Sequence, residues 1–265
     1  MRFMSIASGS SGNSYYVGTD KVSILLDAGI SMKKIDSGLG ELGLSLKDID
    51  AVLITHEHID HIKSLGSIAR KYNIPIYATY GTVDGITTVK SLGTFDYNLL
   101  NPIKNTGSFV LGDMNINVHP ISHDAADPVC YSFENNGHKV SVATDLGVYD
   151  EKLIDFLSES EAMVVEANHD IRMLEVGPYP YSLKKRILGE YGHLCNEAAG
   201  RLIRELLHEK VRYIALGHLS DKNNYPSLAY ETVKQELSDN TYTDDVRDFG
   251  LTVASRSECG AIIEL

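Results

Sequence analysis

The chain has few cysteines and no long apolar run, and these two absences narrow its class. Only three cysteines occur among 265 residues, without the spacing of a metal or redox motif. No apolar segment is long enough for a membrane span, and the first five residues, Met-Arg-Phe-Met-Ser, lack the apolar core of a signal peptide. A cytoplasmic location with free thiols and no membrane partner is therefore the default expectation.

Positive charge is also scarce, which bears on the kind of partner. The 24 lysines and arginines are outnumbered by 36 acidic residues, giving a net charge of −12. A protein that grips nucleic acid through a broad basic face is therefore not expected. A nuclease is compatible with this balance only if bound metals and a local basic patch neutralise the phosphates. The local positive charge is concentrated between positions 171 and 210, in Arg172, Lys184, Lys185, Arg186, Arg201, Arg204 and Lys210.

Sequence features that would divide the chain into several domains are absent as well. There is no linker rich in proline, glycine or serine, no low-complexity segment and no short repeat. The composition, 43% hydrophobic and 23% charged, is ordinary for a globular protein, and a chain of this length can bury one sizeable core. We therefore expect residues 1–265 to form a single domain.

One stretch, residues 55–61, carries four potential metal ligands within six positions. It reads Thr-His-Glu-His-Ile-Asp-His and supplies His56, His58, Asp60 and His61. The short apolar run before it, residues 51–54, is typical of a buried strand. Apolar residues at helical spacing after it predict a helix that begins near Asp60 and extends to Tyr72. The ligands should therefore lie on a strand-to-helix turn, where open α/β sheets place their active sites.

The spacing of these ligands suggests two metal ions rather than one. His56 and His58 alternate on an extended backbone and can point the same way, whereas Asp60 and His61 come one short turn later and can face a second centre. A single three-ligand site would use only the first pair. The alternative, a polar loop that is merely rich in histidine, would need other partners for each buried polar group.

Strand and helix patterns alternate along the chain. Strands are predicted near residues 1–8, 15–18, 22–26 and 74–79, and helices near 32–42 and 81–92. Two hairpins follow, with turns at Gly112-Asp113 and Asn135-Asn136-Gly137. Later strands are predicted near 163–166, 211–216, 244–254 and 260–264, helices near 150–158 and 227–237, and a helical and loop region over 171–210. This order indicates an α+β or α/β fold.

Several predicted strands end in a residue that can bind or support a metal. Besides the cluster at 55–61, these residues are Asp27, His123, Asp145, His169 and His218. One such strand end is commonplace, but the same event repeated over about 190 residues implies that the strand ends converge on one site.

Together these motifs resemble the metallo-β-lactamase-fold hydrolases. The match consists of Asp27, the His-x-His-x-Asp-His motif, His123, Asp145 and His218, in the family's order along essentially the whole chain. Three stretches resemble one branch, the YycJ (WalJ) type of bacterial nuclease acting on DNA: Ser8-Gly9-Ser10-Ser11-Gly12-Asn13-Ser14, Tyr191-Gly192-His193-Leu194, and Gly217-His218-Leu219-Ser220 followed by Asn223-Asn224. The resemblance implies a four-layer αββα sandwich.

The resemblance also assigns roles, residue by residue. One metal would be held by His56, His58 and His123, a second by Asp60, His61 and His218, and Asp145 would bridge both. Asp27 would orient a ligand histidine from outside. His169 also follows a strand, so it either competes with His218 or supports the site from outside. Such ligands suit zinc, manganese or iron, so two divalent ions of these kinds are implied.

The substrate contacts rest on weaker signals. His193 resembles an extra histidine that such nucleases keep near the scissile phosphate, although a surface or capping histidine is the alternative. The loop at residues 8–14 would either bind a substrate anion, through Ser11, Asn13 and backbone N–H groups, or form a tight hairpin only. Ser220, close to His218, is a further candidate.

The function implied by the resemblance is hydrolysis of phosphodiester bonds in nucleic acid. The enzyme would be a 5′–3′ DNA exonuclease, with RNA as an open alternative substrate, in which a hydroxide shared by two metals attacks phosphorus. Its catalytic residues would be Asp60, Asp145 and His193. The 73 positions between Asp145 and His218 leave no room for the large cap domain of RNA-processing relatives. The alternatives are a hydrolase of small esters, thioesters or cyclic phosphodiesters, and a metal-binding module without turnover.

Overall fold

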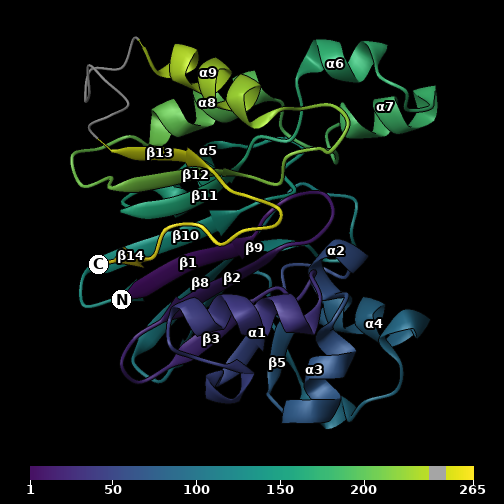
Figure 1. Ribbon diagram of the computed structural model, residues 1–265, viewed down its shortest axis with the longest axis vertical. Helices are drawn as coiled ribbons and strands as arrows, with labels where there is room; N and C mark the ends of the chain where they lie inside the picture. The colour runs from purple at the N-terminus through teal and green to yellow at the C-terminus, as the bar shows by residue number, and fades with distance from the viewer. Residues whose placement is uncertain (239–248) are drawn as a thin grey trace.

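Two β-sheets packed face to face, with helices on both outer sides, make up the protein. The computed structural model describes residues 1–238 and 249–265. Figure 1 shows the layers from top to bottom as helices, sheet, sheet and helices. The four-layer αββα sandwich predicted from the sequence is confirmed.

The first sheet is built mainly by the N-terminal third of the chain. Strands β3 to β6 run parallel, while β14, β1 and β2 are joined in antiparallel pairs. In spatial order it contains β14 (Ile263–Glu264), β1 (Arg2–Ala7), β2 (Ser14–Gly18), β3 (Ser23–Leu26), β4 (Ala51–Leu53), β5 (Ile76–Thr79) and β6 (Leu100–Ile103).

The second sheet has the same division into an antiparallel and a parallel part. The hairpins at Gly112-Asp113 and Asn136-Gly137 join its antiparallel strands, and β10 to β13 run parallel. In spatial order it contains β13 (Gly250–Val253), β12 (Tyr213–Gly217), β11 (Ala162–Glu166), β10 (His138–Ala143), β9 (Val129–Asn135), β8 (Met114–Pro120) and β7 (Gly107–Leu111).

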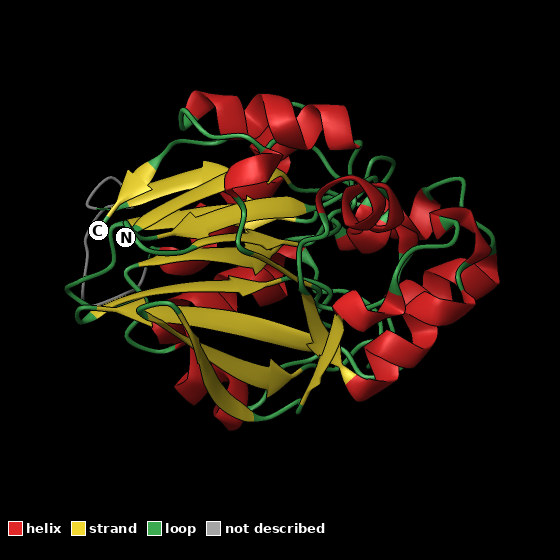
Figure 2. Ribbon diagram, turned by 90° about the horizontal axis from the view of Figure 1, so that it is seen from below, coloured by secondary structure: helices red, strands yellow, loops and turns green. Residues whose placement is uncertain are grey.

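The helices are divided between the two outer faces and one end of the sandwich. The first sheet is covered by α1 (Met32–Glu41), α3 (Leu65–Tyr72) and α4 (Tyr80–Thr88), and the second by α5 (Glu151–Leu157), α8 (Asn196–Leu206) and α9 (Pro226–Leu237). The short helices α2 (Ile59–Ile62), α6 (Ile171–Val176) and α7 (Tyr181–Ile187) lie at the end of the sandwich where the parallel strands finish (Figures 1 and 2). Single 3₁₀ turns occur at Leu46–Asp48, Lys90–Leu92 and Tyr97–Leu99.

Three apolar clusters hold the layers together. One lies between the sheets, where Tyr15 and Leu26 of the first sheet meet Tyr131 and Val142 of the second. The other two lie between each sheet and its helices. Residues of the central strands are buried on both faces, which explains why β4, β11 and β12 are continuous apolar runs in the sequence.

The structure differs from the sequence-based expectations at a few elements. The helix expected from Asp60 to Tyr72 is two helices, because the Ser64 N–H and hydroxyl both donate to the Ala28 carbonyl and end the first one. Strand β6 was not expected. The strand predicted at 244–254 is present as β13, and its first part lies outside the described residues.

The two chain ends lie side by side at the far end of the strands (Figure 1). The N–H of Leu265 donates to the Met1 carbonyl at 2.9 Å. Among the helices of residues 1–238 and 249–265, none is both long enough and apolar enough to cross a membrane.

Candidate metal centre

Three site residues stand directly after strands, in an unusual backbone conformation. Asp27 follows β3 and His218 follows β12 directly, and Asp145 stands one residue further on, after the Thr144 that follows β10. Their φ angles are 60°, 62° and 54°, in the left-handed region that residues other than glycine seldom adopt. The backbone turns sharply at each of these three residues, so that the side chain faces the end of the sandwich. Such outliers gather at functional sites.

The turn after β4 places the four ligands of residues 55–61 at the same end. His56 follows the strand, His58 is the N-cap of α2, and Asp60 and His61 lie on α2. Gly29 allows the loop after Asp27 to approach this turn, because a Cβ at Gly29 would lie 1.6 Å from the Asp60 carbonyl oxygen.

A first group of three histidines converges from both sheets. His58 Nδ1 lies 3.1 Å from His56 Nε2 and 3.2 Å from His123 Nε2. His123 lies in the loop after β8, so the group joins the first sheet to the second. Ligand nitrogens bound tetrahedrally to one zinc ion are about 3.4 Å apart, since zinc–nitrogen bonds are close to 2.05 Å. The spacing of these three nitrogens fits a shared metal ion.

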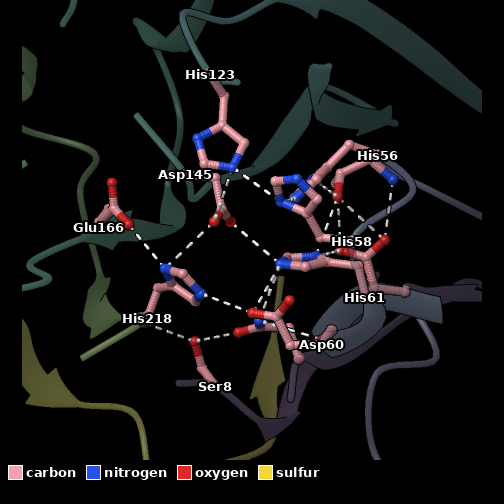
Figure 3. Close-up of polar contacts among 12 residues, drawn as sticks. Ser8, His56, His58, Asp60, His61, His123, Asp145, Glu166 and His218 are labelled. Atoms are coloured by element: carbon pink, nitrogen blue, oxygen red, sulfur yellow. Dashed lines mark hydrogen bonds and ion pairs between the residues drawn. The ribbon is translucent and has the colours of Figure 1, made fainter. Parts of the chain in front are cut away.

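A second group lies beside the first. His218 Nε2 is 3.3 Å and His61 Nε2 is 3.8 Å from Asp60 Oδ2. Asp145 lies between the groups, with Oδ2 at 3.2 Å from His61 Nε2 and Oδ1 at 3.7 Å from His123 Nε2 (Figure 3). The buried Oδ2 accepts no hydrogen bond of good geometry, and such an orphaned carboxylate oxygen is costly. A second cation next to Asp145 would resolve it, so the residues present fit two metal ions.

Most of these histidines are held from behind through their other ring nitrogen. The Nδ1 of His61 donates to Asp27 Oδ2 at 2.7 Å. Thr55 Oγ1 lies 3.0 Å from the Nδ1 of His56, and the Gly192 carbonyl oxygen lies 3.2 Å from the Nδ1 of His123. These contacts select the tautomer whose other nitrogen is free to bind a metal.

Glu166, the last residue of β11, is a buried carboxylate that the sequence reasoning missed. Its Oε1 accepts hydrogen bonds from the Nδ1 of His218 at 2.8 Å and the Nδ1 of His193 at 2.9 Å. Its Oε2 accepts from the backbone N–H groups of Leu146 and Leu194. The sequence carried a signal for it, because Glu166 is an acid at the end of a buried strand, much as Asp27 directly follows one.

Burial and neighbouring charges shift the pKa values of this cluster strongly. Burial would raise the pKa of Asp145, yet His218 and His61 hold it well below its usual range. Burial would lower the pKa of His218, yet the carboxylates of Asp145, Asp60 and Glu166 raise it to about 10. For Glu166 the two adjacent histidines outweigh burial and bring the pKa to about 2. Carboxylates that face imidazoles in this way suit a cation site, because a bound metal takes the place of the imidazole protons.

The other predicted site residues fall in different surroundings. His193 lies at the edge of the centre, with Nδ1 3.8 Å from Asp145 Oδ1. A Cβ at Gly147 would lie 1.9 Å from the Glu190 carbonyl oxygen. The glycine therefore lets the segment that carries Glu190 and His193 approach the centre closely. His169 is buried, neither of its ring nitrogens has a partner among the described residues, and it belongs to neither ligand group.

The three predicted substrate contacts also differ in exposure. Ser11 is exposed at the tip of the loop after β1. Asn13 is buried, and its Nδ2 lies 3.0 Å from His61 Nε2. Ser220 is buried too, and its hydroxyl oxygen accepts from the Asn223 N–H. Of these residues only Asn13 reaches the ligand groups directly.

Comparison with known proteins agrees with this geometry. A model of the beta-lactamase superfamily domain matches residues 23–214. Exodeoxyribonuclease YycJ of Bacillus anthracis is 38% identical over 239 residues, which cover 90% of this chain and 90% of that protein. Exodeoxyribonuclease WalJ of Streptococcus pneumoniae is 38% identical over 237 residues, covering 89% and 88%. The crystal structure of the metallo-beta-lactamase fold protein YhfI from Bacillus subtilis superposes with a TM-score of 0.70 at 17% identity, over 98% of both chains.

Proposed function

Because this chain belongs to the beta-lactamase superfamily and is a hydrolase of the metallo-β-lactamase fold, we propose that it is a metal-dependent exonuclease acting on DNA in the 5′–3′ direction. The identity of 38% to two exodeoxyribonucleases, over at least 89% of this chain, carries the choice of substrate. The two ligand groups around Asp145 support the reaction type, because adjacent cations suit phosphodiester hydrolysis.

Seven side chains would hold the metals. His56, His58 and His123 would hold one ion, Asp60, His61 and His218 the other, and Asp145 would contact both. Manganese, zinc or iron is compatible with these ligands. When bound, two such ions lower the pKa of a coordinated water towards neutrality and stabilise negative charge on the phosphate.

His193 is suited to protonate the leaving oxygen of the cleaved phosphodiester. Its Nδ1–H is engaged by Glu166 Oε1 at 2.9 Å, which leaves Nε2 to exchange a proton with a substrate. The ring is partly exposed, with 15% of the side chain accessible, so substrate can reach it. Glu166 would act through His193 and His218 by fixing how both rings are turned.

The overall negative charge calls for a local DNA contact, and the segment carrying α6 and α7 is the best candidate. Lys184, Lys185 and Arg186 lie on α7, and the backbone after α7 is bonded to the loop that contains His123, through Asp124 N–H to the Tyr191 carbonyl. Tyr181 and Tyr191 on this segment are 82% and 61% exposed. Exposed tyrosines beside lysines suit a DNA strand, because bases stack on rings while cations bind phosphates.

The basic residues expected to act together between positions 171 and 210 are nevertheless divided among several elements, including α7 and α8. Arg201 of α8 pairs with Glu236 of α9 at 3.7 Å, on the helical layer over the second sheet. We therefore assign Lys184 and Lys185 of α7 to DNA, since Arg186 on the same helix is paired with Asp124.

Digestion of end-labelled DNA tests the proposal. Single- and double-stranded DNA carrying a label at either the 5′ or the 3′ end would be incubated with the protein and manganese or zinc. A 5′–3′ exonuclease releases a labelled mononucleotide from the 5′ label at once, whereas the 3′ label gives progressively shorter fragments. RNA of the same sequence is the comparison substrate. Turnover of a small phosphodiester or thioester with intact DNA throughout would overturn the proposal in favour of a small-molecule hydrolase.

A further inference from the structure

We propose that Ser8, Asn13 and Tyr15 form an uncharged hydrogen-bonded bridge that holds the two halves of the second metal site at a fixed separation. This inference rests on the two-metal arrangement of the proposed function. It concerns residues that bind no metal themselves, and we refer to them as the Ser8 bridge.

The hydroxyl of Ser8 is the centre of this bridge. It accepts a hydrogen bond from the backbone N–H of His218 at 2.9 Å (Figure 3). It also lies 2.7 Å from the Tyr15 hydroxyl and donates to Asn13 Oδ1 at 3.3 Å. Burial raises the pKa of the Tyr15 phenol well above its usual value, so Tyr15 stays neutral and can donate to Ser8. All three side chains are buried, so water cannot replace these contacts.

Asn13 extends the bridge to the other half of the site. Its backbone N–H donates to the Asp60 carbonyl at 2.8 Å, and its own carbonyl accepts from the Gly29 N–H. The side-chain Oδ1 accepts from Gly9 N–H and Ser8, which orients the amide so that Nδ2 faces the Asp60 carbonyl and His61 Nε2. Asn13 is thus fixed on both sides of its amide.

The bridge matters because the second metal site is assembled from both sheets. Asp60 and His61 come from the turn after β4 in the first sheet, whereas His218 follows β12 in the second. The chain around Ser8 is itself attached to the second sheet, through Ser8 N–H to the Ser255 carbonyl and Ser10 N–H to the Leu219 carbonyl. Ser8 and Asn13 therefore span the gap that the metal would also span.

The first metal site is joined across the sheets by different contacts. The Val129 N–H donates to the Thr55 carbonyl, and the Tyr131 hydroxyl donates to the Ile54 carbonyl. The Ala126 N–H donates to Glu57 Oε1. None of these contacts involves Ser8 or Asn13, so loss of the Ser8 bridge should affect the second metal selectively.

Removal of single hydroxyl groups tests the proposal with little change in shape. Ser8→Ala removes the centre of the bridge, and Tyr15→Phe removes one contact while keeping the buried ring. Ser141→Ala is the matched control: Ser141 is also buried, and its hydroxyl bonds to Ser160 Oγ at 2.7 Å, away from the site. Manganese and zinc binding would be measured by competition with a chromophoric chelator, together with metal content per chain and the Tm of the metal-free protein.

We expect Ser8→Ala to weaken the second metal about 10- to 100-fold, the usual effect of removing an outer contact of a metal site, and Tyr15→Phe to weaken it less. Ser141→Ala should lower the Tm of the metal-free protein but bind both metals as the wild type does. In a His58→Ala background, which retains the second site, adding Ser8→Ala should weaken the remaining metal. In an Asp60→Ala background, which retains the first site, adding Ser8→Ala should leave the affinity for the remaining metal unchanged.

Two results would overturn the proposal. One is wild-type affinity for the second metal in Ser8→Ala. The other is equal weakening of both metals in proportion to the fall in Tm, which a purely structural serine would produce and which the Ser141→Ala control would reproduce. A wild-type protein that binds fewer than two metals refutes the proposed two-metal function instead, so the two failures are distinguishable.

Discussion

Replacement of Glu166 by glutamine should weaken the second metal far more than the small change in shape suggests. Glu166 accepts four hydrogen bonds, two from backbone N–H groups through Oε2 and two from His193 and His218 through Oε1. Glutamine has one oxygen. If that oxygen keeps the two backbone donors, the NH₂ group faces both histidines and forces each Nδ1 to become an acceptor. Neutral His218 then carries its proton on Nε2, the atom that faces Asp60.

The size of the effect follows from these contacts. A neutral His218 protonated on Nε2 cannot bind a metal through that nitrogen, so binding at the second site must first restore the other tautomer against an unfavourable contact. Loss of such outer contacts typically weakens metal binding about 10- to 100-fold, or about 1.4 to 2.7 kcal/mol. Proton donation by His193 depends on the same carboxylate, so kcat on DNA should fall further and its dependence on pH should change.

A matched variant exists at the other end of the same strand. Glu161, just before β11, is also a buried carboxylate and accepts from the Nδ1 of His138 at 2.8 Å. Chelator competition and DNA digestion would be compared for Glu166→Gln, Glu161→Gln and the wild type. Wild-type affinity for the second metal in Glu166→Gln, or an equal loss in Glu161→Gln, would refute the reasoning.

Further predictions concern the ligands, acid stability and the metals. Asp145→Ala should lose most activity and at least one metal per chain while remaining folded, as metal analysis and circular dichroism would show; full metal-dependent activity would contradict the bridging role. His218→Ala should lose metal and His169→Ala should keep both, since only His218 lies beside Asp60. The pKa of Glu166 is lowered from 4.5 to about 2, so its stabilisation is present above its ordinary pKa and is lost as pH falls towards 2. The difference in unfolding free energy between the metal-free wild type and Glu166→Gln should therefore shrink over that range in denaturant titrations. Removal of metal with a chelator should lower the Tm, and excess manganese or zinc should restore it; an unchanged Tm would argue against bound metals.

Much of the fold was predictable because strong local patterns agree with the tertiary structure. The run before His56 is a strand, the Asn136-Gly137 turn joins β9 to β10, and the strands ending near Asp27 and Glu166 lie where they were expected. The break at Ser64 was not predictable, because it depends on the Ala28 carbonyl, which is distant in sequence. Strand β6 contains Pro102 and has no buried residues, so it lacks the pattern of an inner strand.

The convergence of the candidate ligands on one site was predictable from the sequence, and the residues that support them were less so. Ligand residues are chemically distinctive and stand at strand ends, so their convergence could be inferred. Glu166 and Ser8 resemble any strand-terminal acid and any loop serine, and their importance appears only when His218 is placed between them. Likewise, the sequence could not show that His169 belongs to neither ligand group, because that depends on how the folded chain places it.

The left-handed backbone at the strand ends has a consequence for protein engineering. Replacing a non-glycine residue of positive φ by glycine removes a steric cost of about 1 kcal/mol at that position. Among the described residues this rule selects Asp27, Asn73, Asn136, Asp145, Glu159 and His218. Glu159 is a safe target, since its side chain is 69% exposed and its 3.6 Å pair with Lys210 lies at the surface. The same substitution at Asp27, Asp145 or His218 would remove a side chain from the metal centre. A redesign guided by backbone angles alone would therefore give a better-folded protein in which the metal centre is dismantled.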